Sequence, residues 1–292
     1  MSKGAPTERA RVIDCRQDAV RAVRYNVDGN YCLTCGSDKT VKLWNPIKGS
    51  LLKTYAGTGN EVSGGADKCL TVFDVETGKI LRRWRAHAAR VNAVAFNEES
   101  NVVFSGSVDC TMQAFDNRSR SDKPIQIFNE ATDSVLSIDI NGGEIVAGSA
   151  DCNYRLYSIR EGNVNIDFMG ESVNSVHFTP DGNCVLASTQ DGSLRLMDKM
   201  SGKMLASYCG HKNSEYKVDS CVLASIEEVA TGSEDRFVYI YSLLDSNVLA
   251  KLEHPSKVVH SLSPHPKKQH LLTAAGQLVY LWVSKNDEDF EC

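Results

Sequence analysis

A single pattern of polar and apolar positions recurs along the chain. Small residues lead to a turn aspartate, apolar residues follow three and five positions later, and most copies place an aromatic residue at the sixth. In the first copy, Asp38 is followed by the apolar pair Val41 and Leu43 and by Trp44. This period of two predicts a strand entered through a tight turn that the aspartate caps. Six copies have a structural turn aspartate, at Asp38, Asp67, Asp109, Asp151, Asp191 and Asp235, and a degenerate seventh copy sits at Gly276.

Further short strands surround each of these seven turn positions, which we call the anchors. Apolar runs such as Val91–Phe96 and Val173–Phe178 precede the anchors, and runs such as Lys79–Trp84 follow them. Two of the preceding runs end in Asp-Gly hairpin turns, at Asp28-Gly29 and Asp181-Gly182, where glycine supplies the positive φ. Each unit therefore carries about four short antiparallel strands, which is typical of a β-propeller blade.

The anchors are spaced by 29, 42, 42, 40, 44 and 41 residues, so we expect seven blades. The strand Arg11–Cys15 would complete the last blade and leave no long free edge. These limits divide the chain into an N-terminal tail at 1–10, one propeller at 11–284 and an acidic C-terminal tail at 285–292.

The spacing of 29 is an anomaly, because the second unit lacks about a dozen residues relative to the ~40-residue period of such repeats. Only residues 56–63 separate the first blade from the second anchor motif, and an inner strand with its hairpin does not fit there. The second blade is therefore expected to be truncated. Either the sequence comes from a truncated gene model or splice form, or the propeller has one incomplete blade. Loss of one contiguous block favours the first explanation.

The repeats resemble the WD-repeat family over essentially the whole chain. Leu43-Trp44-Asn45 approximates the signature dipeptide of that family, and Gly210-His211 matches its other landmark. The resemblance implies a seven-bladed WD-type β-propeller, with the second blade truncated. It also implies a hydrogen-bonded set within a blade, made of a histidine, a strand serine or threonine, the turn aspartate and an aromatic residue. Two sets are expected, from His211, Thr231, Asp235 and Tyr241 and from His87, Ser105, Asp109 and Phe115.

Longer stretches are similar to one branch of the WD-repeat family, whose members organise mitogen-activated protein kinase cascades. They are residues 20–40, 179–183, 194–199 and 210–217. This resemblance implies a non-enzymatic scaffold that docks several proteins, with components of such a cascade as partners. It also implies an alternative role as a spliceosome-associated factor in pre-mRNA splicing, and hence a cytoplasmic and nuclear location.

Composition and charge exclude several other classes. The chain has 292 residues, 42% of them apolar, and a net charge of −5, which argues against direct nucleic-acid binding through a basic face. No apolar run is long enough to span a membrane, and residues 1–6 do not read as a signal peptide, so we expect a soluble intracellular protein with reduced cysteines. Cys32 and Cys35 lie three apart in a strand, so their side chains point to opposite faces and do not form a metal or redox pair.

Enzymatic motifs are missing from the sequence. Residues 57–62 contain two glycines but neither the third glycine of a dinucleotide fingerprint nor a following helix, and no P-loop, Gly-x-Ser-x-Gly or His-Glu-x-x-His motif occurs. Four histidines, His254, His260, His265 and His270, are flanked by prolines and lysines, which indicates a surface turn rather than a metal site. We therefore expect no catalytic residue, metal or cofactor.

Candidate docking residues lie beside the starts of the inner strands. These starts are expected to line the narrow mouth of the propeller, where Tyr and Arg are favoured as binding hot spots. The partner-binding candidates are Arg21, Arg90, Asn92, Asn174, Tyr216, Lys217 and His260.

A second candidate surface follows Phe115. Asp116-Asn117-Arg118 resembles the Asp-x-Arg box by which some WD-repeat proteins dock onto cullin-RING ubiquitin ligases. Asp116 and Arg118 therefore keep a third alternative open, that of a substrate adaptor for such a ligase.

Overall fold

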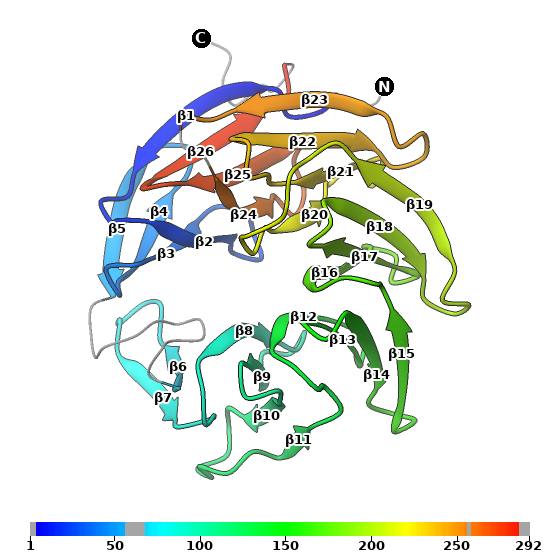
Figure 1. The fold of residues 1–292 in the computed structure, drawn as a ribbon. Helices are drawn as coiled ribbons and strands as arrows, with labels where there is room; N and C mark the ends of the chain where they lie inside the picture. The colour runs from blue at the N-terminus through cyan, green and yellow to red at the C-terminus, as the bar shows by residue number, and fades with distance from the viewer. Residues whose placement is uncertain (1–3, 56–67, 256–257, 286–292) are drawn as a thin grey trace. The chain divides into compact units, whose positions relative to one another are not determined.

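The computed structural model describes residues 4–55, 68–255 and 258–285, which form 26 β-strands and no helix. The chain divides into two compact units. Unit 1 contains residues up to 56, 191–195 and from 206 onward, and unit 2 contains residues 57–190 and 196–205. In five of the four-stranded sheets the strands follow one another along the chain as a meander (Figure 1). In the remaining one, three consecutive strands are joined by a strand from the N-terminal segment.

Three four-stranded sheets lie in unit 1. One has the order β2-β3-β4-β5, with strands Val20–Tyr25, Cys32–Gly36, Val41–Asn45 and Ser50–Tyr55. The next has the order β20-β21-β22-β23, with strands Ser220–Val222, Glu228–Thr231, Phe237–Ser242 and Val248–Glu253. The third has the order β1-β26-β25-β24, with strands Glu8–Asp14, Leu278–Val283, His270–Ala275 and Val259–Pro264.

The third sheet confirms that the N-terminal strand completes the last blade. Strand β1 pairs antiparallel with β26, with Val12 opposite Tyr280 and Ile13 opposite Val279. The strand begins at Glu8 rather than at Arg11, so it extends into the segment expected to be a tail. Its pairing with β26 reaches back to Glu8 opposite Val283, which explains the earlier start.

Unit 2 holds two further four-stranded sheets. One has the order β11-β10-β9-β8, with strands Gln126–Phe128, Met112–Asp116, Val102–Ser107 and Val91–Phe96. The other has the order β12-β13-β14-β15, with strands Val135–Asn141, Glu144–Ser149, Asn153–Ser158 and Asn163–Phe168. A sixth sheet, β16-β17-β18-β19, contributes residues to both units through strands Val173–Phe178, Cys184–Thr189, Ser193–Asp198 and Met204–Cys209.

The blade count differs from the sequence prediction. The described residues form six four-stranded blades, so the expected seven-bladed propeller is wrong in number although the all-β class is confirmed. Where the second blade was expected, β6 (Leu70–Phe73) and β7 (Ile80–Trp84) form a two-stranded sheet. Asp67 and residues 56–63 lie outside the described residues, as does most of the expected C-terminal tail.

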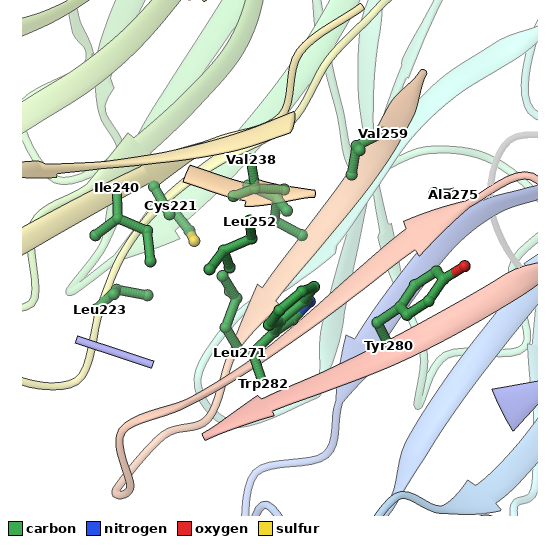
Figure 2. Packing of buried hydrophobic residues seen from close by; sticks show 12 residues of the cluster. Cys221, Leu223, Val238, Ile240, Leu252, Val259, Leu271, Ala275, Tyr280 and Trp282 are labelled. Atoms are coloured by element: carbon green, nitrogen blue, oxygen red, sulfur yellow. The ribbon is translucent and has the colours of Figure 1, made fainter. Parts of the chain in front are cut away.

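The period-two pattern is explained by cores between neighbouring sheets. In unit 1, Ile240 and Leu252 from one sheet pack with Leu271 and Trp282 from the next, and all four are almost fully buried (Figure 2). Burying a side chain of this size contributes about 1.5–3 kcal/mol. Apolar residues at alternate positions therefore attach each sheet to its neighbours.

The two Asp-Gly hairpins form as predicted. Gly29 and Gly182 have φ values of +77° and +69°, and their N–H groups donate to the carbonyls of Asn26 and Thr179. A residue with a Cβ atom disfavours this conformation, so glycine fits both turns.

Side-chain oxygens join the inner strands of neighbouring sheets in unit 1. Ser261 Oγ on β24 accepts the backbone N–H of Val23 on β2 at 3.2 Å, and Ser263 Oγ accepts that of Tyr25 at 2.9 Å. An inner strand is the edge of its sheet, so these N–H groups have no strand to pair with. The serine hydroxyls take the place of that missing strand.

Unit 2 repeats the arrangement with a different pair of residues. Ser137 Oγ on β12 accepts the N–H of Val176 on β16 at 3.1 Å, and an Asp139 carboxylate oxygen accepts that of Phe178 at 2.8 Å. Ser137 and Ser261 are each the third residue of their strand. The same register position thus satisfies an edge in both units.

Removing one such hydroxyl is expected to destabilise unit 1. Ser261→Ala leaves the N–H of Val23 without its acceptor in a buried position, and we expect a loss of about 1–3 kcal/mol in the free energy of unfolding. Urea denaturation measures this change. The control Ser50→Ala, at an exposed position of the outer strand β5, should shift the midpoint little. Equal midpoints for the two variants would contradict the bridging role of Ser261.

Candidate docking site

Turn aspartates have the same local geometry in every described copy. In each, a carboxylate oxygen accepts the backbone N–H two residues later, at 2.9–3.2 Å. This contact caps the tight turn before the third strand of the sheet. The five aspartates are Asp38, Asp109, Asp151, Asp191 and Asp235, and they act within the fold rather than on a ligand.

The hydrogen-bonded set expected around His87 is present. His87 Nδ1 lies 3.0 Å from Asp109 Oδ2, and Nε2 lies 2.9 Å from Ser105 Oγ. Phe115 takes the aromatic position and packs on Trp84, with ring centroids 5.2 Å apart. The histidine therefore links the start of this sheet to its turn aspartate and its second strand.

The set expected around His211 forms only in part. Asp235 accepts the hydroxyl of Tyr239 at 2.7 Å, and Thr231 Oγ1 donates to the carbonyl of Gly232. Neither residue forms a hydrogen bond with His211 within the described part of the chain. Tyr241 donates its hydroxyl to the Cys209 carbonyl, so its oxygen accepts from His211 Nδ1 at 3.2 Å. His211 Nε2 is buried without a hydrogen-bond partner among the described residues.

Two similar sets were missed in the sequence. His254 Nδ1 donates to the Leu252 carbonyl, and Nε2 accepts from Thr273 Oγ1 at 2.7 Å, which in turn accepts the indole N–H of Trp282 at 3.0 Å. His254, His265 and His270 are buried, so the prediction of a surface turn for these histidines was wrong. Strand β25 begins at His270 and carries it into the core.

In the first sheet Gln17 takes the place of histidine. Its amide oxygen accepts from Thr34 Oγ1 at 2.5 Å, and Trp44 donates its indole N–H to the same hydroxyl at 3.0 Å. Its amide nitrogen donates to Thr40 Oγ1, which donates to Asp38. A glutamine is absent from the usual sequence signature, which is why this set was not predicted.

Four of the seven docking candidates come together in unit 1. Arg21 is the second residue of β2 and His260 the second residue of β24, while Tyr216 and Lys217 lie in the segment before β20. Arg21 NH1 lies 3.4 Å from His260 Nε2, and the ring of Tyr216 meets that of His260 edge-on at 5.7 Å. His260 also hydrogen-bonds the backbone of Lys217. We call these four residues the Arg21 cluster.

The loop that carries Tyr216 is held by Glu234, which the sequence did not single out. One carboxylate oxygen, Oε1, accepts the backbone N–H groups of Ser214, Glu215 and Tyr216 at 2.7–2.8 Å, and Oε2 accepts the Ser214 hydroxyl. Although partial burial raises the pKa of Glu234, these N–H donors lower it on balance. The loop is therefore fixed around a carboxylate that stays ionised.

The remaining candidates lie in unit 2. Arg90 Nε donates to Asn92 Oδ1 at 3.1 Å, and Asn92 donates its amide to the Val135 carbonyl at 3.1 Å. Asn174 on β16 is only 4% exposed, which leaves a partner little to contact. Asn92 and Asn174 thus serve the packing of their sheets, while Arg90 stays exposed.

The ligase-docking candidates occupy the end of β10. Asp116 accepts the backbone N–H of Arg118 at 2.9 Å, and its carboxylate also lies 3.7 Å from Arg118 Nε. The Arg118 side chain is 73% exposed. The turn therefore presents the guanidinium outward.

Other chemistry is sparse in the described part of the chain. Residues 4–55, 68–255 and 258–285 contain no group of three or more His, Cys, Asp or Glu side chains able to hold a metal, and their cysteines are all free. Cys32 and Cys35 are both buried. None of the described segments contains a helix long and apolar enough to cross a membrane.

Comparison with known proteins places the chain in a family. The family described as "WD domain, G-beta repeat" matches residues 8–45, 78–116 and 165–198. A rat protein named WD repeat domain-containing protein 83 is 45% identical over 97% of this chain and 94% of its own length. The chain belongs to the WD repeat domain-containing protein 83 family. It is therefore an all-β WD40 propeller protein.

Other members of this family show similar coverage. The human protein of that name is 46% identical over 95% of this chain and 92% of its own length. A Dictyostelium discoideum homolog is 32% identical over 91% and 94%. None of these names states an enzymatic activity.

The three matched repeats are offset from the sheets. Each ends at the last residue of a third strand, at Asn45, Asp116 or Asp198. Each begins in or just before an outer strand, which is β1, β7 or β15. One sequence repeat therefore supplies the outer strand of one sheet and the first three strands of another.

Mild acid is expected to destabilise unit 1 through its buried histidines. Burial lowers the pKa of both His211 and His254 to about 4, so the folded chain keeps them neutral while the unfolded chain protonates near pH 6.5. Their stabilising effect is complete above about pH 6.5 and is lost as the pH falls toward 4. We expect a loss of about 2 kcal/mol per histidine between pH 7 and pH 5, measured by urea denaturation.

Two glutamine variants test this pH dependence. His254→Gln removes one titrating group, and Gln17 shows that glutamine can receive the strand hydroxyl in such a set. His254→Gln and His211→Gln should each remove about 2 kcal/mol of the acid-induced loss. An unchanged pH dependence in both variants would refute the assignment.

Proposed function

We propose that the chain is a non-enzymatic scaffold that docks several proteins, among them components of a mitogen-activated protein kinase cascade. WD40 propellers generally mediate protein–protein contacts, and rigid sheets that carry fixed loops let several partners bind one chain. The observation that carries the proposal is the Arg21 cluster, in which Tyr216 is 44% exposed on a loop already held by Glu234. A pre-organised aromatic residue loses little entropy on binding, which favours it as a hot spot.

The resemblance to the kinase-cascade branch supports this choice of partners. The same resemblance supports the alternative of a spliceosome-associated factor. Under either alternative we expect the chain in both the cytoplasm and the nucleus. The class of protein that binds through Tyr216 distinguishes the two roles.

Loss of the exposed aromatic residue is expected to weaken docking. Tyr216→Ala should reduce partner affinity about tenfold or more, as truncation of a hot-spot tyrosine does. Quantitative mass spectrometry of proteins that co-purify with the tagged chain at native level measures the effect. Kinase-cascade proteins that disappear with the variant support the scaffold, and splicing factors that do so support the alternative.

A matched control separates docking from folding. Leu249 is 51% exposed on the outer strand β23 of the same unit, so Leu249→Ala should leave the captured proteins unchanged. The scaffold proposal fails for this surface if Tyr216→Ala and Leu249→Ala capture the same proteins in the same amounts.

The exposed guanidinium of Arg118 favours a second candidate function, that of a substrate adaptor for a cullin-RING ubiquitin ligase. The Arg118 side chain is exposed to solvent, and Asp116 stabilises the turn by accepting the backbone N–H of Arg118. If the adaptor role holds, Arg118→Ala should lower ligase capture by tenfold or more. Arg120→Ala, at another exposed arginine of the same loop, should not. Co-purification of cullin subunits measures both, and equal capture by the two variants excludes this candidate.

A further inference from the structure

Arg21 has a positive charge that its surroundings do not neutralise. Its guanidinium meets the Ser37 hydroxyl at 3.3 Å and the His260 ring at 3.4 Å, both uncharged acceptors. No carboxylate among the described residues lies within 4.0 Å of it. Arginine presents five N–H donors, so most of them are available to a carboxylate from outside the chain.

His260 holds Arg21 in place and stays neutral. Burial lowers the pKa of His260, and the charge of Arg21 lowers it further. The ring therefore donates one N–H to the Lys217 backbone and offers its other nitrogen, Nε2, to Arg21. A guanidinium fixed in this way loses little freedom when it binds a ligand.

Two carboxylates of the segments around the cluster already have partners. Asp219 receives Arg24 at 2.8 Å and Ser261 at 2.9 Å, and Glu234 receives the backbone of the Tyr216 loop. Glu215 is exposed on that loop and has no ion pair among the described residues. Arg21 and Lys217 are both exposed, and none of the four residues of the Arg21 cluster is a carboxylate, so their side chains carry a net positive charge.

Tyr216 adds an apolar surface beside this charge. Its ring stands edge-on to His260, and the residue is 44% exposed. Arg21 and Tyr216 both contact His260, and a guanidinium and an aromatic group on the same ring suit a peptide in which an acidic side chain neighbours an apolar one. A fully polar segment would leave Tyr216 without an apolar contact, and a basic segment would be repelled by Arg21.

We propose that the Arg21 cluster docks an acidic segment of a partner protein, with an aspartate or glutamate on Arg21 and an adjacent apolar side chain on Tyr216. This inference rests on the proposed scaffold function and names the chemistry of one docked partner.

Fluorescence anisotropy with short labelled peptides tests the inference on the full chain. The probe is a nine-residue Gly/Ser peptide that carries one Glu beside one Leu, and its analogue replaces Glu by Gln. We expect the Glu peptide to bind about tenfold more tightly than the Gln peptide and to weaken with added salt. Arg21→Ala should abolish the difference, while Glu215→Gln should increase the affinity for the Glu peptide about twofold to threefold by removing a like charge.

A matched arginine serves as the control. Arg16 is exposed in the same unit, so Arg16→Ala should keep the tenfold preference for Glu. The inference is overturned if the Glu and Gln peptides bind equally or not at all, or if Arg21→Ala keeps the preference. A phosphoserine peptide that binds while the Glu peptide does not overturns it as well, since the ligand would then be a phosphate.

This outcome is separable from that of the scaffold proposal. Peptide binding is measured in purified protein, whereas the scaffold test measures proteins captured from cells. Loss of captured partners with Tyr216→Ala but no preference for Glu would leave the scaffold standing without its acidic ligand. A preference for Glu with unchanged capture would refute the scaffold role of this surface alone.

Discussion

The packing of the described sheets depends on one constraint, which is that the unpaired N–H groups along the edge of each inner strand need hydrogen-bond acceptors. A strand at the end of a sheet exposes N–H groups that pair with no neighbour, and burial makes this costly. Ser261 and Ser137 resolve the problem in their units by accepting an N–H of the next inner strand. Because the hydroxyl lies at a fixed register of its strand, this hydrogen bond constrains how the two neighbouring sheets pack. The second residue of each inner strand is thereby also fixed, and in unit 1 this places Arg21 against His260.

Within the sheets, one geometric problem has several chemical solutions. The second-strand hydroxyl receives His87 in one sheet, His254 in another and Gln17 in a third. In a fourth sheet, the buried Arg155 binds the turn aspartate Asp151 directly at 2.7 Å. What these share is a buried side chain with two hydrogen-bonding ends, so residue identity can vary while the connection is kept.

The sequence predicted the strands and turns well, because alternation and turn aspartates are local signals. It predicted poorly what depends on partners far apart in the chain. Asp235 was expected to hydrogen-bond His211, but its carboxylate accepts the hydroxyl of Tyr239, which lies on the same strand as Tyr241. Glu234 was overlooked because its role depends on the backbone of a loop some twenty residues away. The described residues form six four-stranded sheets and one two-stranded sheet, so the anchor spacing indicated a deficit but not how many strands the short unit keeps among them.

The pairing of β1 with β26 has a consequence for biosynthesis. Strand β1 is synthesised before every other described strand, whereas its sheet partners β24, β25 and β26 are synthesised after all the other described strands. Until then β1 has no backbone partner, and β26 later emerges with an edge that only β1 covers. The nascent chain therefore carries an unpaired strand from the synthesis of β1 until that of β26, and we expect a chaperone that shields β1 during this interval to limit aggregation.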